Sequence, residues 1–380
     1  MKTLLWPSSR WMRLPAVLLL GLVLGACSSS PTKPKPVELP PGANLIGVRQ
    51  AWSLKLDPTD FPAQPRVMGT QIAVASGAGN VLILAGDTGV PAWRFDLQTP
   101  LSAAIGFDGK KVAVVTRANE LVVLEDAKVL WRQRLAATTL TPPLVAGERV
   151  FVLGGDRSVS AFDGRSGRRI WQQQRAGDAL LLRQAGLLTA IGDTLVVGLA
   201  GKMVGMNPLN GSARWEVPIA SPRGVNDIER LVDLIAGVSR ESAVVCARAF
   251  QAAVGCVDTS RGNLVWSKPA NGAVGLSGNP QAVYGVEADS TVLAWRRTDG
   301  ERLWSQEVLR YRGLGNPTVA GRSVVVGDGN GMLHFLSRED GSPLARMSTD
   351  GSAIEAAPVL AGNTLVVFTR AGGVFGFQPE

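Results

Sequence analysis

The sequence has 380 residues, of which 18% are charged, and its formal net charge of +8 is spread along the chain without a basic run. Nucleic-acid-binding surfaces gather lysine and arginine into patches or stripes, so this distribution argues against a nucleic-acid partner. The chain has a single histidine, His334, which leaves little for the catalytic centres that depend on that residue.

The chain begins with the pattern of an export signal. Lys2, Arg10 and Arg13 form a basic flank, and residues 17–24 form an apolar run that is too short to span a bilayer. The run ends in Leu24-Gly25-Ala26-Cys27, which resembles the lipobox of bacterial lipoproteins. We therefore predict a lipoprotein signal peptide at residues 1–26. The alternative is an ordinary secretory peptide in which the cysteine is accidental.

Residues 27–45 are predicted to be a lipidated Cys27 followed by a flexible tether. The proline-rich composition of this stretch cannot form a packed core and is typical of an extended linker. Several acyl chains, at about 0.8 kcal/mol per buried methylene, make such an anchor nearly permanent. By the same resemblance, Ser28 after the cysteine implies sorting to the outer membrane of a Gram-negative bacterium, with the protein facing the periplasm.

From residue 46 onward, a tryptophan returns about every forty residues, just after a glycine-containing turn. A fixed period of this size is typical of a repeat architecture. A methionine stands where the eighth tryptophan is expected. The eight positions are Trp52, Trp93, Trp131, Trp171, Trp215, Trp266, Trp304 and Met347.

Each period contains four short apolar runs between turn residues. From Pro317 onward, the runs cover 317–320, 323–327, 332–336 and 343–347. The breaks between them supply the glycine, asparagine and aspartate that tight hairpins need. Four antiparallel strands in a period of about forty residues describe one propeller blade. We predict an all-β, eight-bladed β-propeller of four-stranded antiparallel blades.

The predicted propeller covers residues 46–380 as one domain. Its ring must close to leave few open edges, and we expect residues 51–56 to pair with the last blade near 373–377. The repeated tryptophans are expected to pack between neighbouring blades, where a large ring buries much apolar area. They are therefore interpreted as structural residues and not as a ligand platform.

Two cysteines remain after Cys27. Cys246 and Cys256 lie on two predicted successive strands of one blade, around a turn near 250–251. An exported protein is in a compartment that permits disulfides. Whether the two side chains face each other depends on the register of the hairpin, so a disulfide and a pair of buried thiols both remain open.

The sequence gives little support for an active site. His334 lies inside the predicted strand 332–336, which favours a structural role. No group of His, Cys, Asp and Glu has the spacing of a metal site. The glycine-rich stretch 327–331 is a hairpin tip and not a phosphate loop, because no helix follows it. We predict that the chain is not an enzyme and holds neither a metal nor a cofactor.

The tryptophan repeat also resembles that of quinoprotein alcohol dehydrogenases, which bind pyrroloquinoline quinone. This resemblance implies an alternative function, a propeller that binds a cofactor or small molecule in its central channel. Members of that family are much longer, and their cofactor site uses an adjacent pair of cysteines and Ca²⁺ ligands. Cys246 and Cys256 are not adjacent in this sequence.

The repeat is least regular in the middle of the chain. The spacing of the tryptophans is mostly 38–41 residues, but it is 44 before Trp215 and 51 before Trp266. The extra residues lie in 178–186 and 221–237, which mix leucine and isoleucine with arginine and aspartate. This combination is typical of protein–protein contacts, and consecutive periods should bring the two segments together. The alternative is that Leu180 to Leu182 form an innermost strand.

The anchor, the tether and the eight marked blades together resemble the BamB family, the lipoprotein subunits of the outer-membrane β-barrel assembly machine. The likeness covers essentially the whole chain and includes the stretches 180–183, 227–233 and 324–334. It implies a scaffold without catalysis that binds the periplasmic domains of BamA, the central barrel subunit. It also implies assistance in the folding and insertion of β-barrel outer membrane proteins, by a monomer within a larger complex.

The contact motif of that family is Leu-x-Leu-Arg in one loop and Asp-x-Asp in the next. Leu180, Leu182 and Arg183 match the first part, and Asp233 matches the first acid of the second. Ile235 takes the place of the second acid. The leucines are expected to supply apolar contact area, Arg183 to donate hydrogen bonds to the partner, and Asp233 to orient Arg183 or the partner. Unfolded outer membrane proteins are a second expected partner, through strand addition to a blade edge.

Overall fold

The computed structural model describes Thr3 and residues 34–174, 182–221 and 231–380. Contacts divide the chain into two units, Met1–Lys35 and Pro36–Glu380, and the fold below is that of the second unit. The described residues form 32 strands in eight antiparallel sheets of four strands each. Within this described part of the chain, no helix has the length and apolar character needed to cross a membrane.

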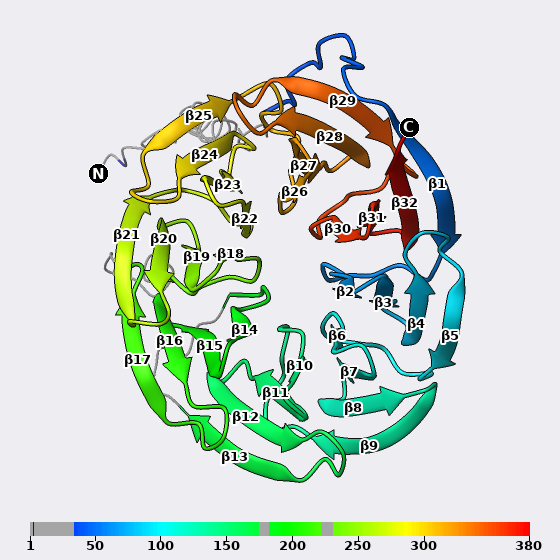
Figure 1. Ribbon diagram of the computed structural model, residues 1–380, viewed down its shortest axis with the longest axis vertical. Helices are drawn as coiled ribbons and strands as arrows, with labels where there is room; N and C mark the ends of the chain where they lie inside the picture. The colour runs from blue at the N-terminus through cyan, green and yellow to red at the C-terminus, as the bar shows by residue number, and fades with distance from the viewer. Residues whose placement is uncertain (1–2, 4–33, 175–181, 222–230) are drawn as a thin grey trace. The chain divides into compact units, whose positions relative to one another are not determined.

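The sheets are the blades of a β-propeller, and in blades 1 to 7 the strands run in chain order from the centre of the ring to its rim (Figure 1). Blades 1 and 2 contain β2 (Arg66–Met68), β3 (Gln71–Ala75), β4 (Asn80–Ala85), β5 (Pro91–Asp96), and β6 (Gly106–Phe107), β7 (Lys111–Val115), β8 (Glu120–Glu125), β9 (Lys128–Arg134). Blades 3 and 4 contain β10 (Leu144–Ala146), β11 (Arg149–Leu153), β12 (Ser158–Asp163), β13 (Arg169–Gln174), and β14 (Leu188–Ile191), β15 (Thr194–Leu199), β16 (Lys202–Met206), β17 (Ala213–Pro218).

Blades 5 to 7 repeat this order, and blade 8 takes its fourth strand from the start of the propeller. Blades 5 and 6 contain β18 (Ser239–Glu241), β19 (Val244–Ala249), β20 (Ala253–Asp258), β21 (Asn263–Pro269), and β22 (Leu276–Gly278), β23 (Ala282–Val286), β24 (Val292–Arg296), β25 (Arg302–Gln306). Blades 7 and 8 contain β26 (Thr318–Ala320), β27 (Ser323–Gly327), β28 (Met332–Ser337), β29 (Pro343–Ser348), and β30 (Val359–Ala361), β31 (Thr364–Phe368), β32 (Gly373–Pro379), β1 (Val48–Lys55).

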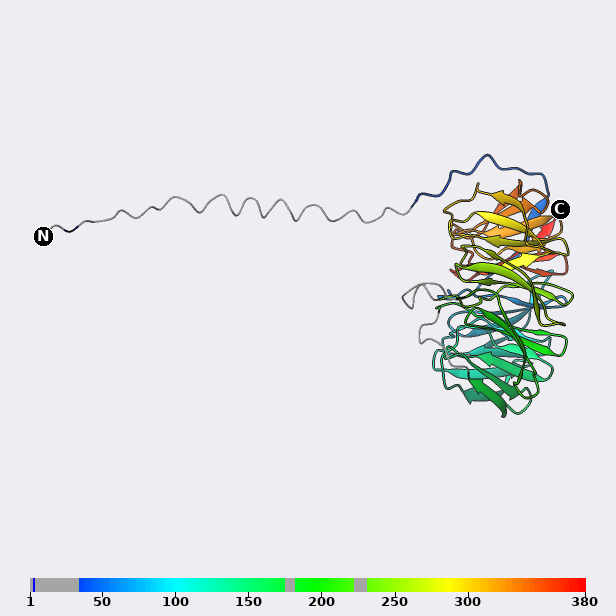
Figure 2. The ribbon, with the colours of Figure 1, turned by 90° about the vertical axis from the view of Figure 1, so that its left-hand side faces the viewer.

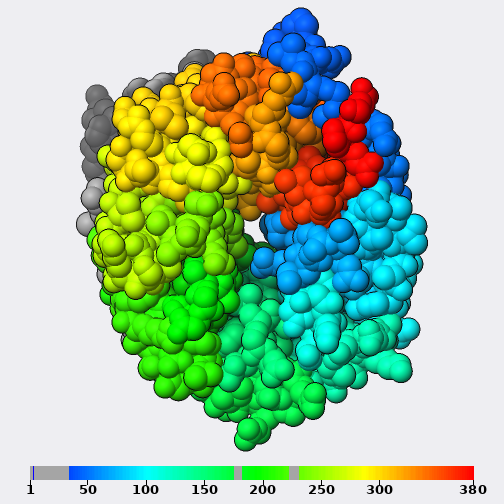
Figure 3. All heavy atoms as spheres, viewed as in Figure 1, coloured from blue at the N-terminus to red at the C-terminus, as the bar shows by residue number. Residues whose placement is uncertain are grey.

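The hydrophobic core lies between neighbouring blades. The two middle strands of most blades are buried on both faces, which is why they appear in the sequence as continuous apolar runs and not as alternating ones. One cluster, for example, joins Ile83 of blade 1 to Val112 and Val122 of blade 2. The ring is seen from the side in Figure 2, and Figure 3 shows the opening that remains at its centre.

The ring closes by pairing the first strand with the last. β1 is antiparallel to β32, and the register places Trp52 opposite Gly376 and Lys55 opposite Gly373. The closing blade therefore has the strand order β1-β32-β31-β30. The predicted eight-bladed fold and its predicted closure are both confirmed.

The repeated tryptophans lock each blade to the next one. Trp131 of blade 2 donates from Nε1 to the carbonyl of Gly164 in blade 3, at 3.1 Å. Its ring lies on Gly167, whose φ is +72°, and a Cβ there would be 2.6 Å from the ring. A glycine at positive φ lies in the same way against Trp52, Trp171, Trp215, Trp266 and Trp304, and it supplies both the left-handed backbone and the space for the ring. The same donation joins Trp52 to Gly86, Trp171 to Pro208, Trp266 to Arg297 and Trp304 to Arg338.

The closing blade explains why Met347 replaces the eighth tryptophan. Six of the seven tryptophans lie against the glycine of the turn between the third and fourth strands of the next blade. In blade 8 those strands are β32 and β1, which belong to opposite ends of the propeller and have no turn between them. Met347 packs instead against a buried cluster of blades 7 and 8 that includes Leu333, Leu365 and Phe377.

Part of the predicted tether is packed on the propeller. The compact unit begins at Pro36, within the stretch 27–45 that composition alone assigns to a flexible linker. The Leu45 amide donates to the Leu344 carbonyl of β29 at 2.8 Å, and Arg322 donates back to the Leu45 carbonyl at 2.8 Å. Residues 36–47, dark blue in Figure 2, therefore form a strap against blades 6 and 7.

A disulfide links the two middle strands of blade 5. Cys246 on β19 lies directly opposite Cys256 on β20, with the Cα atoms 3.9 Å apart. Both residues are fully buried. The structure joins them in a disulfide, so the bridge connects adjacent strands of one blade around the turn at 250–251.

Candidate partner-binding site

The two long periods of the repeat are joined by backbone pairing. Gly186 and Ile235 form an isolated antiparallel bridge. Beside it, the Leu187 amide donates to the Leu234 carbonyl at 3.1 Å. The segment before β14 therefore lies against the segment before β18, as the position of the long periods predicts.

The segment 231–237 also forms backbone hydrogen bonds with blade 5. The Phe250 amide donates to the Asp233 carbonyl, and the Ile235 amide donates to the Arg248 carbonyl, both at 3.1 Å. Ile235 is buried, so a carboxylate at this position would lose its hydration. This burial accounts for the isoleucine at the place of the second acid.

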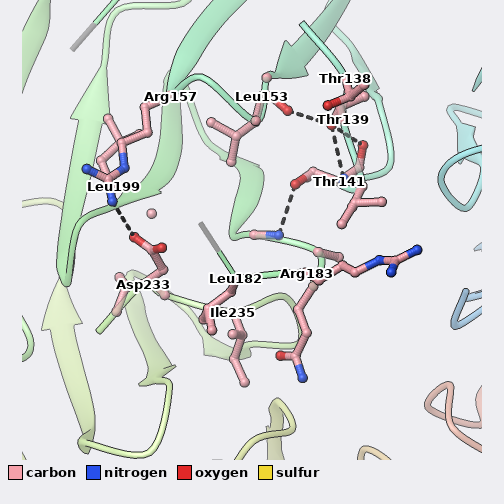
Figure 4. Close-up of a pocket in the computed structure, with 18 residues that line it drawn as sticks. Thr138, Thr139, Thr141, Leu153, Arg157, Leu182, Arg183, Leu199, Asp233 and Ile235 are labelled. Atoms are coloured by element: carbon pink, nitrogen blue, oxygen red, sulfur yellow. Dashed lines mark hydrogen bonds and ion pairs between the residues drawn. The ribbon is translucent and has the colours of Figure 1, made fainter. Parts of the chain in front are cut away.

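A pocket of about 340 Å³ opens between these segments and blade 3 (Figure 4). Its walls come from the connection between blades 2 and 3, from the turns after β11 and β15, and from 182–186 and 233–235. Leu153, Leu182 and Leu199 give it an apolar lining. A volume of this size suits a small ligand or one or two side chains of a partner protein.

Threonine side chains fix the wall of the pocket. The Thr139 hydroxyl donates to the Leu153 carbonyl at 2.6 Å, and the Gly186 amide donates to the Thr141 hydroxyl at 2.9 Å (Figure 4). These bonds join the blade 2–3 connection to blade 3 on one side and to the segment before β14 on the other. The shape of the pocket is therefore set by hydrogen-bonded backbone.

The structure describes three of the four predicted contact residues. Leu182 is half-buried in the pocket wall and Arg183 is exposed, whereas Leu180 lies outside the described residues, as Cys27 does. The innermost strand of blade 4 begins only at Leu188. The alternative that placed Leu182 in that strand is therefore wrong.

Asp233 faces Arg157 and not Arg183. The Arg157 Nη2 atom lies 3.6 Å from Asp233 Oδ1, and both side chains are largely buried. Figure 4 shows the Arg183 side chain directed away from Asp233. The expectation that Asp233 orients Arg183 thus has no support in this geometry. The sequence analysis missed Arg157, whose signal is an arginine at a turn position where blades 1, 7 and 8 have glycine.

His334 belongs to a buried cluster in blade 7. Its Nε2 lies 3.0 Å from Asp328 Oδ2, which also accepts from Arg312 Nε at 2.9 Å. Burial lowers the pKa of His334 below its usual value, although the bond to Asp328 opposes this, so the imidazole is neutral at pH 7. A neutral, buried imidazole that is hydrogen-bonded to Asp328 through Nε2 has a structural role.

The described residues do not fit the quinone site that the second resemblance implies. Among them, no group of three or more His, Cys, Asp or Glu side chains could hold a metal ion. Cys246 and Cys256 are bonded to each other inside blade 5 and are not an adjacent pair. The chemistry of the available donors therefore differs from that of a quinoprotein centre.

Comparison with known structures supports the fold. The crystal structure of BamB from Moraxella catarrhalis aligns with a TM-score of 0.80 and 24% identity, over 87% of this chain and 99% of that chain. A quinohemoprotein alcohol dehydrogenase from Pseudomonas putida aligns with a TM-score of 0.68 and 14% identity, over 88% of this chain and 77% of that chain. At these identities the likeness concerns the fold alone.

Comparison of sequences shows the family. A protein of Burkholderia pseudomallei named outer membrane protein assembly factor BamB is 37% identical over 94% of this chain and 96% of its own length. The protein of that name in Bordetella pertussis is 34% identical over 94% of this chain and 95% of its own length. The family model described as outer membrane protein assembly factor BamB matches residues 77–306 and 299–380. The chain therefore belongs to the BamB family.

Proposed function

We propose that the chain is a non-catalytic scaffold in outer membrane protein assembly, and that its pocket site binds the periplasmic domains of BamA. The observation that carries this proposal is the pairing of the two long-period segments, which places Leu182, Arg183 and Asp233 around one pocket. Membership of the BamB family supports the assembly role.

The geometry gives each residue a part in binding. Leu182 supplies apolar area in the pocket wall, where a partner side chain can be desolvated. Arg183 is exposed, and its guanidinium has five donors for carboxylates or backbone carbonyls. Asp233 keeps the neighbouring Arg157 in place. Such a small, convergent set is what interface hot spots look like.

Anchoring and location are part of the same proposal. Acylation of Cys27 after removal of residues 1–26 attaches the protein to the outer membrane on its periplasmic side. The lipobox-like Leu24-Gly25-Ala26-Cys27 supports this. Of the predicted tether 27–45, the residues from Pro36 onward belong to the compact unit. A short tether keeps the propeller near the membrane surface.

The test is binding of the purified full-length chain to the purified periplasmic region of BamA from the same source. Arg183→Glu should weaken binding by about 2 kcal/mol, roughly thirtyfold, because it replaces the donor by a repelling charge. Leu182→Ala should weaken binding by about 1 kcal/mol. The control is Arg165→Glu, which reverses an exposed arginine on the rim of blade 3. Binding that survives both site variants contradicts the assignment.

Unfolded outer membrane proteins are the second partner that we propose, bound by strand addition at the rim. The outer strands β9, β13, β21 and β25 stand at the ends of their sheets. The residue before the tryptophan is exposed and apolar on each of them: Leu130, Ile170, Val265 and Leu303. A free strand edge beside apolar side chains favours pairing with an extended chain.

This second partner can be tested with charged substitutions on the rim. The double variant Ile170→Lys with Leu303→Lys should capture less of an unfolded barrel protein in a co-sedimentation assay, by about threefold, because lysine blunts strand edges. Val90→Lys is the matched control, since Val90 is exposed but lies in a turn. Equal capture by the wild type and the double variant would rule out this mode.

A further inference from the structure

Arg157 occupies a backbone position that other blades give to small residues. It ends the turn between the second and third strands of blade 3, where its amide donates to the carbonyl three residues earlier, and its φ is +62°. Five other blades make the same turn with the residues Gly79, Asn119, Ser290, Gly331 and Gly372, all at positive φ. A long side chain in this left-handed conformation costs roughly 1 kcal/mol or more relative to glycine. The cost of this conformation motivates a search for a function of the Arg157 side chain.

The guanidinium of Arg157 is buried but not satisfied. Arg157 is only 8% exposed, and its distance of 3.6 Å to the Asp233 carboxylate is beyond hydrogen-bond reach. Its Nε is buried and has no hydrogen-bond partner among the described residues. Native structures rarely leave a buried charged donor in this state. Because Nη2 meets Asp233 only at ion-pair distance and Arg157 lines the pocket, the Nη donors are available to a group that enters it.

The guanidinium of Arg157 lies where a partner side chain could reach it. Arg157 lines the pocket together with Asp233 and Leu182 (Figure 4). The charged residues of the lining are Arg157, Arg183 and Asp233, so the pocket has an excess of one positive charge. A carboxylate is the group that satisfies both the excess charge and the unused fork of donors. The leucine walls add a preference for an apolar neighbour beside that carboxylate.

We propose that Arg157 is a partner-binding residue, and that the pocket receives an acidic side chain next to an apolar one from a loop of the partner protein. This inference rests on the proposed function, in which that partner is the periplasmic region of BamA. Asp233 then acts by positioning Arg157, and the family contact extends from the two long segments to blade 3. The strained turn keeps the arginine in place before the partner arrives.

The substitution Arg157→Gly separates binding from folding. Glycine is the residue that the same turn carries in blades 1, 7 and 8, so relief of the left-handed strain offsets the missing packing of the arginine side chain. The full-length variant should melt close to the wild-type temperature and bind the BamA periplasmic region about thirtyfold more weakly. Arg157→Lys keeps the positive charge but lacks the planar set of guanidinium donors, and it should bind the BamA periplasmic region about fivefold more weakly. Asn119→Gly, at the same turn position of blade 2, should bind like the wild type.

The outcomes are distinct for this inference and for the function on which it rests. If the wild type binds, Arg183→Glu does not, and Arg157→Gly binds like the wild type, the proposed function stands and Arg157 has only a structural role. If Arg157→Gly fails to fold, Arg157→Lys decides, and wild-type affinity in that variant overturns the inference. Absence of binding by the wild type overturns both.

Discussion

Replacement of Trp131 by alanine is expected to lower the free energy of unfolding by about 3–5 kcal/mol, the cost of removing a large aromatic side chain from a packed interface. The side chain is 8% exposed, donates to the Gly164 carbonyl and lies in a cluster with residues of both blades 2 and 3. Its ring centroid is 6.3 Å from that of Phe162. Urea denaturation of the full-length chain, followed by fluorescence and circular dichroism, measures the effect.

The neighbouring residue provides the control for this prediction. Leu130 precedes Trp131 on the same strand but is 41% exposed, so Leu130→Ala should cost less than about 1 kcal/mol. Gly167→Ala should destabilise the same interface, because its positive φ and the nearby tryptophan ring leave no room for a Cβ. Equal effects of Trp131→Ala and Leu130→Ala would show that the tryptophan is not an inter-blade lock.

The contact of Trp131 with blade 3 also affects the pocket. Trp131 lies on β9, and the chain passes from β9 through residues 138–141 into blade 3. Those residues form one wall of the pocket, with Thr139 and Thr141 bonded across it. A tryptophan on the rim thus fixes the blade on which one wall of the pocket is built.

The fold could be predicted from the sequence because each blade repeats the same physical requirements. A glycine at positive φ with a tryptophan ring against it recurs at six junctions between blades, so the period is visible without a structure. The pairing of β1 with β32 followed from the need to close the ring. The identity of Met347 could not be interpreted in advance, because it depends on which blade has no outer turn.

The site could be predicted only in part. The long periods pointed to the segments that carry Leu182, Arg183 and Asp233, and the structure brings those segments together. Arg157 was missed because its significance depends on a left-handed turn and on an ion pair with a residue far along the chain. Neither feature appears in a motif of adjacent residues.

The strap was missed for a related physical reason. A proline-rich composition indicates that a segment cannot form its own core, but it does not exclude docking on another surface. Val37 and Leu45 bond to Arg310 and Leu344, which are remote in sequence, through backbone groups that composition does not describe. Arg312 adds a bond from its Nη1 to the Val37 carbonyl at 3.3 Å.

Asp328 is the residue that connects this strap to the core of blade 7, and its charge is expected to carry much of the acid sensitivity of the protein. It is fully buried, and its Oδ1 accepts from the amides of Asn330 and Met332, both at 2.9 Å. Burial alone would raise the pKa of Asp328, but the bonds from His334, Met332 and Arg312 outweigh it and hold the pKa at about 2. The ionised carboxylate is therefore part of the native structure.

The lowered pKa values of Asp328 and His334 act in the same direction on stability. Each group binds its proton more weakly in the folded chain, so protons favour the unfolded chain as the pH falls. The contribution of Asp328 is fully present above its unfolded pKa of 3.8 and is lost as the pH falls toward its folded value of about 2. That difference corresponds to about 2 kcal/mol. His334 adds a loss that begins below its unfolded pKa of 6.5.

Asp328→Asn is expected to destabilise the protein by about 3–5 kcal/mol at pH 7, because it leaves the largely buried cation of Arg312 without its counter-charge. The difference in the free energy of unfolding between wild type and variant should narrow by about 2 kcal/mol between pH 4 and pH 2. In this range the wild-type carboxylate itself becomes protonated. Denaturation midpoints across this range measure both effects, and Asp340→Asn, in an exposed turn of the same blade, should change stability by less than about 1 kcal/mol. If this difference in stability stayed constant with pH, the destabilisation of the variant would reflect altered packing and not the lost charge. A difference that narrows as expected would establish that the charge of this one buried carboxylate, paired with Arg312, stabilises the folded chain.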